Sequence, residues 1–134
     1  MTYARIVPVE FNHCDPAGIV FFPRYFDMMQ DAFEAFMKAR GLPAARIMKE
    51  THYYLPLVRA ECDFRAPLIW GDRLRVEVKV NEVRRRSFSV DYRFRNDEDR
   101  TVAQGYTAHV VADKSTRRAI PVPEELRRAL EDPA

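Results

Sequence analysis

The chain has 134 residues, which is enough for one domain with its own core but not for two. Hydrophobic residues make up 47% of the chain and charged residues 31%, a composition that excludes intrinsic disorder. The 22 Lys and Arg residues nearly balance the 20 Asp and Glu residues, so the net charge of +2 argues against a protein that binds nucleic acid.

The first residues alternate in polarity and lack the apolar stretch that secretory signals contain. No apolar run is long enough to cross a bilayer, so we expect neither export nor a membrane span, and a cytoplasmic location. The two cysteines are Cys14 and Cys62, and we expect both to be free thiols in a reducing compartment.

The first half of the chain predicts a strand, a turn and a helix, in that order. Residues 3–11 alternate between apolar and polar, which predicts a strand. The Asp-Pro-Ala-Gly sequence at 15–18 predicts a turn. Residues 23–40 predict a helix, because Pro23 suits a first helical turn and large apolar residues recur at helical spacing. Gly41 marks the expected end of this helix.

The second half predicts mostly antiparallel strands. We place them at 74–80, 88–94, 101–112 and 119–122. Gly105 interrupts the third of these and suggests a bulge or a bend, and Pro123 opens a short final helix. One helix and one large sheet make an α+β fold. Because one helix cannot cover both faces of such a sheet, we expect a homo-oligomer.

Asp15 is the strongest candidate for a catalytic group. It lies between the first strand and the helix, three residues before Gly18. Backbone N–H groups and the helix dipole favour an anion or an oxyanion at the start of a helix. A carboxylate a few residues upstream could attack a carbonyl held there, or activate a water molecule that does. The competing interpretation is structural, because Asp-Pro commonly opens a turn.

A thiol nucleophile and a metal site are both disfavoured. His13 and Cys14 are adjacent, so in an extended chain their side chains point to opposite faces and cannot pair. His52 and His109 have no ligand-like spacing to His13, and no cluster of cysteines or carboxylates completes a set. We therefore expect no metal.

Three consecutive arginines, Arg84, Arg85 and Arg86, lie between two predicted strands. Guanidinium groups bind phosphates through paired hydrogen bonds, so the cluster fits a ligand such as a nucleotide or coenzyme A. The competing interpretation is a solvated loop. The chain has no glycine-rich phosphate loop.

Three segments carry motifs that belong together. Residues 9–25 combine a strand, the sequence CDPAGIV, an aromatic pair and P-x-Y at the start of the helix. Residues 64–74 contain P-x-x-x-G-D-x-L, and residues 84–88 read RRRSF. Together they strongly resemble the 4-hydroxybenzoyl-CoA thioesterase family of hotdog-fold enzymes, whose third motif reads R-R-K-S-F.

This resemblance implies a hotdog fold, in which a curved antiparallel sheet wraps a long central helix. It also implies a homodimer, or a homotetramer made of dimers, with active sites between subunits. Asp15 would be the catalytic aspartate, acting as a nucleophile or as a general base. The backbone N–H of Phe22 would polarise the thioester carbonyl.

The resemblance further implies the residues that bind the substrate. Arg84, Arg85 and Arg86 would hold the phosphates of coenzyme A, which is part of the substrate, so that no separate cofactor is expected. The other positions that it implies near the substrate are Gly18, Tyr25 and Gln30.

Two positions depart from the family pattern and leave the acyl group open. Phe22 stands where the 4-hydroxybenzoyl members carry tyrosine, and Gln30 where they carry an aspartate that binds the ring hydroxyl. Aromatic, short-chain and medium-chain acyl groups all remain candidates. Competing functions are dehydration of hydroxyacyl thioesters, which would need a histidine on the helix, non-catalytic binding of acyl-CoA, and hydrolysis of acyl carrier protein thioesters.

Overall fold

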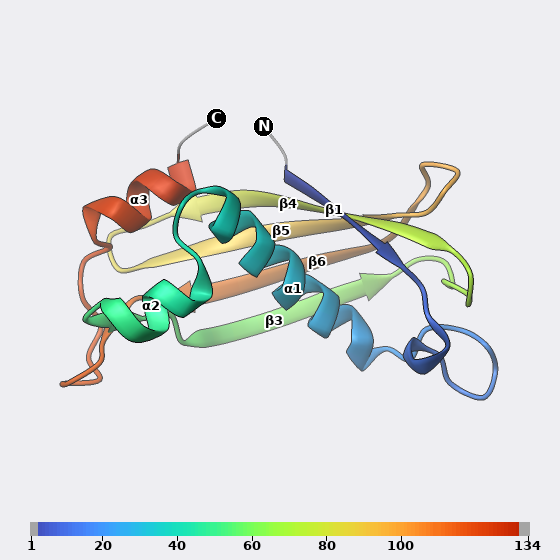
Figure 1. Ribbon diagram of the computed structural model, residues 1–134, viewed down its shortest axis with the longest axis horizontal. Coiled ribbons are helices and arrows are strands. Elements are labelled where there is room, and N and C mark those ends of the chain that lie inside the picture. Colours follow the sequence, from blue (N-terminus) through green and yellow to red (C-terminus); the bar gives the residue numbers. More distant parts are fainter. Residues whose placement is uncertain (1–2, 132–134) are drawn as a thin grey trace.

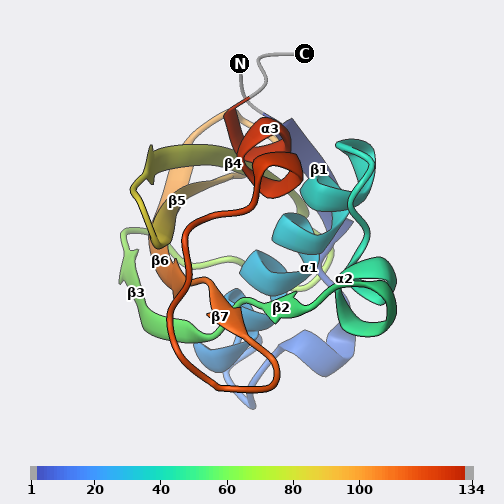
Figure 2. The same ribbon diagram turned by 90° about the vertical axis from the view of Figure 1, so that its left-hand side faces the viewer.

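The computed structural model describes residues 3–131, and five antiparallel strands form its main sheet (Figure 1). Their order across the sheet is β1-β4-β5-β6-β3. The strands are β1 (Tyr3–Pro8), β3 (Leu57–Phe64), β4 (Arg73–Val83), β5 (Ser87–Arg95) and β6 (Thr101–Val110). Two short strands, β2 (Tyr53–Tyr54) and β7 (Ala112–Asp113), pair separately. Figure 2 shows the main sheet curling around one helix, α1.

Helix α1 (Pro23–Ala39) confirms the helix predicted at 23–40. Its apolar face lies against the sheet and buries seven side chains, those of Tyr25, Met28, Met29, Ala32, Phe33, Phe36 and Met37. The helix ends where Gly41 adopts a φ of 81°. The N–H of Leu42 then donates to the carbonyl of Met37 at 2.9 Å, and the N–H of Gly41 to that of Lys38 at 3.1 Å. These two bonds make a Schellman motif, which satisfies carbonyls that a helix end otherwise leaves unpaired.

The two faces of the sheet differ as the alternation predicts. Leu74, Val76 and Val78 of β4 are buried toward α1. On the opposite face, charged residues of β4 and β5 lie across from one another, as in the pair Glu77 and Arg93. That face carries charged side chains, so it offers little apolar surface for a partner to cover, and the homo-oligomer stays a prediction. What remains unpaired in the described chain are the outer edges of the two end strands, since β1 pairs only with β4 and β3 only with β6.

Gly105 does not create the expected bulge. Strand β6 runs through it without a break, with Gly105 opposite Tyr92 on one side and Cys62 on the other. A Cβ atom at this position would lie 2.5 Å from the Sδ atom of Met29. Glycine is therefore needed because the helix approaches the sheet closely at this point.

Several elements differ from the sequence prediction. Helix α2 (Ala44–Glu50) and strand β3 were not recognised, and β3 is exposed along nearly its whole length, which removes the alternation that marks a half-buried strand. The predicted strand at 119–122 is a single bridge between Ala112 and Ala119. The first strand ends at Pro8, and a 3-10 turn, η1 (Phe11–His13), follows it.

The final helix, α3 (Glu124–Glu131), confirms the prediction from Pro123. Between residues 3 and 131, no helix is long and apolar enough to span a membrane.

Candidate active site

Asp15 lies in a hairpin between β1 and α1. Its N–H donates to the carbonyl of Ile19, and the N–H of Gly18 donates to the carbonyl of Asp15, both at 2.9 Å. The N–H of Phe21 pairs with the carbonyl of His13 further along the two arms. Gly18 has a φ of 80°, which an L side chain rarely adopts, so its role here is to let the chain turn. The turn predicted at 15–18 is confirmed.

The carboxylate of Asp15 is half-buried and only partly engaged by the protein. Its Oδ1 atom accepts a hydrogen bond from the N–H of Ala17 at 2.9 Å, which orients the side chain. Within the described chain no other donor and no cation pairs with this carboxylate. One carboxylate oxygen is therefore free to act on a substrate or on a water molecule.

Phe22 supplies a free backbone donor at the start of α1. The N–H of Arg24 donates to the carbonyl of Phe21, the N–H of Tyr25 donates to that of Phe22, and Pro23 has no N–H. The N–H of Phe22 has no partner among residues 3–131. An unpaired donor at the positive end of a helix is suited to stabilising an oxyanion.

Tyr25 follows on α1, but its ring lies inside the core. It is 3% exposed and packs against Phe64 and Phe94, with ring centroids 4.8 and 5.3 Å away. Burial raises the pKa of its hydroxyl to about 12. This packing gives Tyr25 a structural role in the isolated chain, and a contact with substrate stays a prediction.

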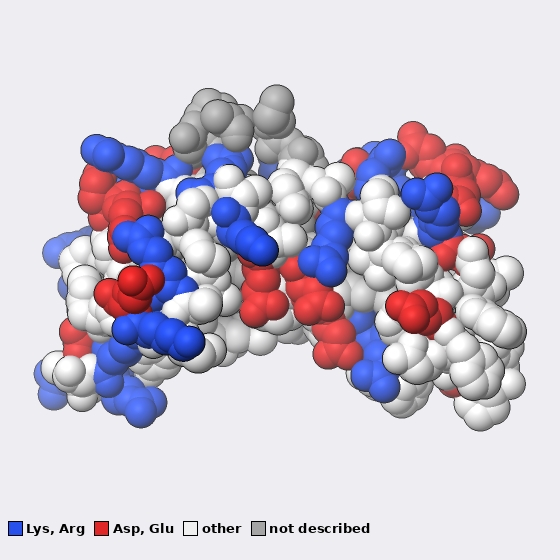
Figure 3. Space-filling view, in the orientation of Figure 1, with Lys and Arg blue, Asp and Glu red and all other residues white. Residues whose placement is uncertain are grey.

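Large apolar side chains surround the Asp15 hairpin and are open to solvent. Phe11 and Trp70 form an edge-to-face pair with centroids 5.4 Å apart, and Phe21 and Phe22 form another at the same distance. In Figure 3 the lower part of the right-hand end, where this hairpin lies, is largely free of charged side chains. The candidate carboxylate thus stands in an apolar surface that a ligand or another chain can cover.

The arginine cluster lies on the turn between β4 and β5. The guanidinium group of Arg84 pairs with Glu82 at 3.1 Å, and this carboxylate raises the pKa of Arg84. The side chains of Arg85 and Arg86 are exposed and have no partner in the described part of the chain. Arg85 and Arg86 are thus the two members of the cluster that are free to bind phosphate.

The Asp15 hairpin and the arginine cluster lie at opposite ends of the molecule (Figure 1). The hairpin follows β1, whose last residue, Pro8, pairs with Arg73 at the start of β4. The arginines follow the other end of β4, which is 11 residues long. Eleven residues of extended chain span about 35 Å. A single chain therefore does not bring the candidate carboxylate and the candidate phosphate-binding residues together.

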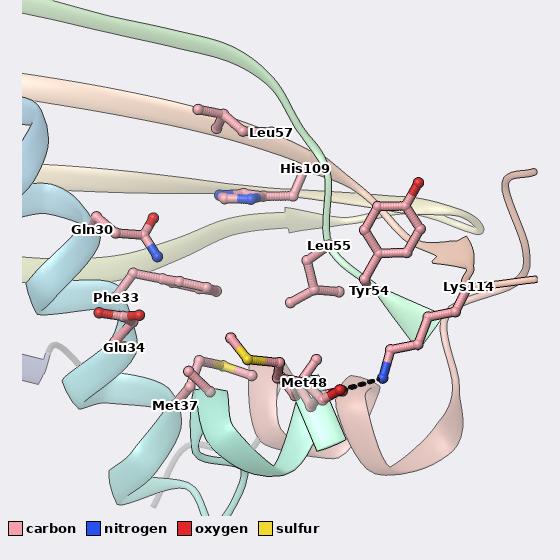
Figure 4. A pocket seen from close by; sticks show the side chains of 12 residues that line it. Gln30, Phe33, Glu34, Met37, Met48, Tyr54, Leu55, Leu57, His109 and Lys114 are labelled. Carbon is pink, nitrogen blue, oxygen red and sulfur yellow. Dashed lines mark hydrogen bonds between the residues drawn. The ribbon is translucent and has the colours of Figure 1, made fainter. Parts of the chain in front are cut away.

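A cavity of about 340 Å³ opens between α1 and α2, toward the end of the molecule that carries the arginines (Figure 4). Small-molecule sites typically occupy about 300–1,000 Å³. Its lining is mostly apolar and comes from both helices and the nearby strands. The lining residues are Gln30, Phe33, Glu34, Met37, Ala44, Ile47, Met48, Tyr54, Leu55, Leu57, His109 and Lys114.

Comparison with known proteins places the chain in a family. Residues 9–130 match the sequence profile of the thioesterase-like superfamily. The chain belongs to this superfamily. It is 32% identical to the 1,4-dihydroxy-2-naphthoyl-CoA hydrolase of Synechococcus elongatus over 120 residues, covering 89% of this chain and 88% of that protein. It is 31% identical to the Synechocystis protein of the same name over 132 residues, covering 98% and 94% of the two chains.

Solved structures of thioesterases superimpose on this chain and support the same assignment. The 1,4-dihydroxy-2-naphthoyl-CoA thioesterase from Synechocystis superimposes with a TM-score of 0.92 at 29% identity, covering 98% of this chain and 97% of that one. A gentisyl-coenzyme A thioesterase gives a TM-score of 0.86 at 29% identity, covering 96% and 99%. These matches confirm the α+β hotdog fold and the enzyme class, thioester hydrolysis of acyl-CoA. The predicted resemblance is therefore confirmed for the superfamily, and the relatives named above carry the name of a 1,4-dihydroxy-2-naphthoyl-CoA or a gentisyl-coenzyme A thioesterase.

The described residues form neither a thiol nucleophile paired with a histidine base nor a metal site. The Nδ1 atom of His13 accepts a hydrogen bond from the N–H of Glu10 at 2.9 Å, and the Sγ atom of Cys14 donates to the carbonyl of Glu10 at 3.6 Å, so the two side chains do not bond to each other. Cys14 and Cys62 are both free thiols. Residues 3–131 contain no group of three or more side chains that could hold a metal ion.

The sequence analysis missed two residues that shape the cavity. His109 is 4% exposed and its ring stacks on Phe33, with centroids 5.2 Å apart and planes 16° apart. Burial lowers the pKa of His109 to about 4, so the ring is neutral at pH 7. Lys114 donates to the carbonyls of Ile47, Met48 and Thr51 at 2.6–2.9 Å and so caps α2. The alternation of buried and exposed residues in β6 could have indicated that His109 points into the core.

Proposed function

We propose that this thioesterase hydrolyses a hydroxylated aromatic acyl-CoA, with 1,4-dihydroxy-2-naphthoyl-CoA as the first candidate substrate. The names of the curated relatives and of the Synechocystis structure support this choice, and the matches cover nearly the whole of each chain. The gentisyl-coenzyme A thioesterase supports a single hydroxylated ring as the second candidate. Gln30, where 4-hydroxybenzoyl members carry aspartate, disfavours 4-hydroxybenzoate.

The proposed chemistry rests on the partly unpaired carboxylate of Asp15 and the unpaired N–H of Phe22 among the described residues. The thioester carbonyl oxygen accepts a hydrogen bond from the free N–H of Phe22, which stabilises the negative charge that develops there. Asp15 then acts in one of two ways. It attacks the carbonyl carbon, which expels coenzyme A as thiolate and leaves an anhydride for water to cleave, or it takes a proton from a water molecule that attacks directly. Both routes give the free acid and coenzyme A.

We propose that one active site uses parts of two copies of the chain. Within one copy, Asp15 and the arginine cluster are separated by the length of β4, about 35 Å. A second copy in antiparallel orientation presents its Arg85 and Arg86 near the first copy's Asp15. The unpaired edge of β3, with Leu57 and Val58 exposed, is the surface on which a second copy can extend the sheet. A homodimer is the minimal assembly, and a homotetramer repeats it.

Hydrolysis of a panel of acyl-CoA thioesters, followed by release of free thiol, tests the proposed function. We expect the highest kcat/KM for hydroxylated naphthoyl-CoA or benzoyl-CoA substrates and little activity on the matching acyl carrier protein thioesters. Binding of acyl-CoA without thiol release would contradict the proposal in favour of a binding module. We also expect a cytoplasmic location, from the sequence.

A further inference from the structure

The cavity between α1 and α2 has a closed floor and an open rim (Figure 4). Phe33, Met37 and His109 form the floor, and none of them is more than 5% exposed. Leu57 and Met48 form part of the rim and are 54% and 72% exposed. A ligand therefore enters past the rim and ends against buried side chains of the core.

The polar atoms of the floor are already paired. The Nε2 atom of His109 lies 3.0 Å from the Oγ1 atom of Thr107, and the ring also hydrogen-bonds to the backbone of Leu55. The Oγ1 atom of Thr107 in turn lies 3.0 Å from the hydroxyl of Tyr92. Lys114 also lines the cavity, and its ammonium group already donates hydrogen bonds to three backbone carbonyls. A hydroxyl pushed to the floor finds no free partner there, and an unpaired buried hydroxyl is costly.

The floor is also aromatic. The rings of Phe33, His109 and Phe88 stack on one another with centroids 4.9–6.0 Å apart and planes within 22° of parallel. An uncharged aromatic lining favours an aromatic ring over a charged group. The floor thus fits an unsubstituted aromatic ring.

The rim offers a carboxylate that no protein group uses. Glu34 lies on α1 one turn after Gln30, lines the cavity and is half-buried. It makes no hydrogen bond or ion pair with any residue that the structure describes. A carboxylate accepts strong hydrogen bonds from hydroxyl groups, so Glu34 is suited to a hydroxyl that stays near the rim.

The cavity lies toward the arginine end of its own chain, so in a site shared by two copies it belongs to the copy that supplies Arg85 and Arg86 and faces Asp15 of the other copy. We infer that this cavity is the subsite for the far end of the acyl group, that its floor takes the unsubstituted ring of a fused aromatic system, and that Glu34 accepts a hydrogen bond from a hydroxyl on the nearer ring. This inference rests on the proposed thioesterase function and specifies its substrate. In 1,4-dihydroxy-2-naphthoyl-CoA both hydroxyls are on the ring that carries the thioester, and the fused ring has none. The cavity therefore matches the position of the hydroxyls as well as the size of the acyl group.

Four substrates test the orientation: benzoyl-CoA, 2-naphthoyl-CoA, 1,4-dihydroxy-2-naphthoyl-CoA and 6-hydroxy-2-naphthoyl-CoA. The last carries its hydroxyl at the far end, where it would meet the floor. We expect its kcat/KM to be about tenfold or more below that of 2-naphthoyl-CoA, because the hydroxyl is left unpaired. Equal kcat/KM values for these two substrates would overturn the assignment of the floor.

Substitutions test the same subsite from the protein side. Ala44 lines the cavity and Ala45, the next residue, is exposed and does not. Ala44→Leu should lower the ratio of kcat/KM for 2-naphthoyl-CoA to that for benzoyl-CoA about tenfold, whereas Ala45→Leu should leave the ratio unchanged. An unchanged ratio in a folded Ala44→Leu variant would count against a subsite for the second ring.

Glu34→Gln and Glu34→Ala test the hydroxyl contact, with Asp31→Asn, at an exposed position of the same helix, as the control. Both Glu34 variants should lower the ratio of kcat/KM for 1,4-dihydroxy-2-naphthoyl-CoA to that for 2-naphthoyl-CoA, with alanine lowering it by about tenfold or more. If thiol is released from these substrates but the ratios do not change, the subsite is refuted and the thioesterase function stands. If no acyl-CoA is hydrolysed by the wild type, both are refuted.

Discussion

The Sδ atom of Met29 lies 2.5 Å from the place where a Cβ atom on Gly105 would be. Helix α1 and strand β6 touch at this point without any side chain from the strand between them. Met29 is 1% exposed, so its side chain has no solvent to move into.

We expect Gly105→Ala to lower the free energy of unfolding by about 1–3 kcal/mol, the usual cost of overpacking a core. The melting temperature should fall by several degrees. The control is the same change in a Met29→Ala background, where the added methyl group has room and should cost much less. Equal costs in the two backgrounds would show that Met29 is not the reason for the glycine.

Asp15→Asn should leave the fold intact and nearly abolish turnover. Asparagine keeps the oxygen that accepts the hydrogen bond from the N–H of Ala17, so the turn is preserved. It cannot serve as a nucleophile or a base, and kcat should fall by about a hundredfold or more. Thiol release and the melting temperature are to be measured together, with Asp31→Asn as the control. Activity within tenfold of wild type would remove Asp15 from the mechanism.

Replacing Arg85 and Arg86 together with alanine should raise KM about tenfold with little change in kcat, because both side chains are free to bind phosphate. Arg84→Ala should do less, since Glu82 already holds that guanidinium group. The effect of the double change should vanish with a pantetheine thioester, which lacks the nucleotide phosphates. An equal rise in KM for both substrates would exclude a phosphate contact.

The same variants show whether two copies share a site. Coexpression of Asp15→Asn chains with chains that lack both arginines gives mixed dimers. If one site takes Asp15 from one copy and the arginines from the other, half of the sites in a mixed dimer contain both functional parts. Turnover at low substrate concentration should then rise well above that of either parent, since the first parent has almost no kcat and the second has a KM raised about tenfold. Mixed dimers no more active than the average of the two parents would place the site within one chain.

Acid should weaken the fold through His109. Burial lowers the pKa of its ring to about 4, whereas in the unfolded chain a histidine has a pKa near 6.5. Between these values the unfolded chain binds more protons, so the free energy of unfolding falls as the pH drops from about 6.5 to 4, by about 3 kcal/mol in all. Urea unfolding at pH 7, 5.5 and 4.5 measures this slope. His109→Phe should flatten it and His52→Phe, at an exposed position, should not.

The sequence by itself determined the local features of this protein. Its alternation set β4, β5 and β6, because a half-buried strand must alternate. The spacing of apolar residues and Gly41 set α1 and its end. The motif around Asp15 indicated the turn and the candidate carboxylate, because both depend only on residues close together in the chain.

The tertiary structure alone decided how these parts relate. β3 is an exposed edge with no pattern of its own, and it is placed only by its pairing with β6. The need for glycine at 105 comes from Met29 on a distant helix, and the cavity exists only where α2 faces α1. Asp15 and the arginine cluster end far apart because β4 is extended over 11 residues, and its length separates two motifs that the sequence could not place relative to each other.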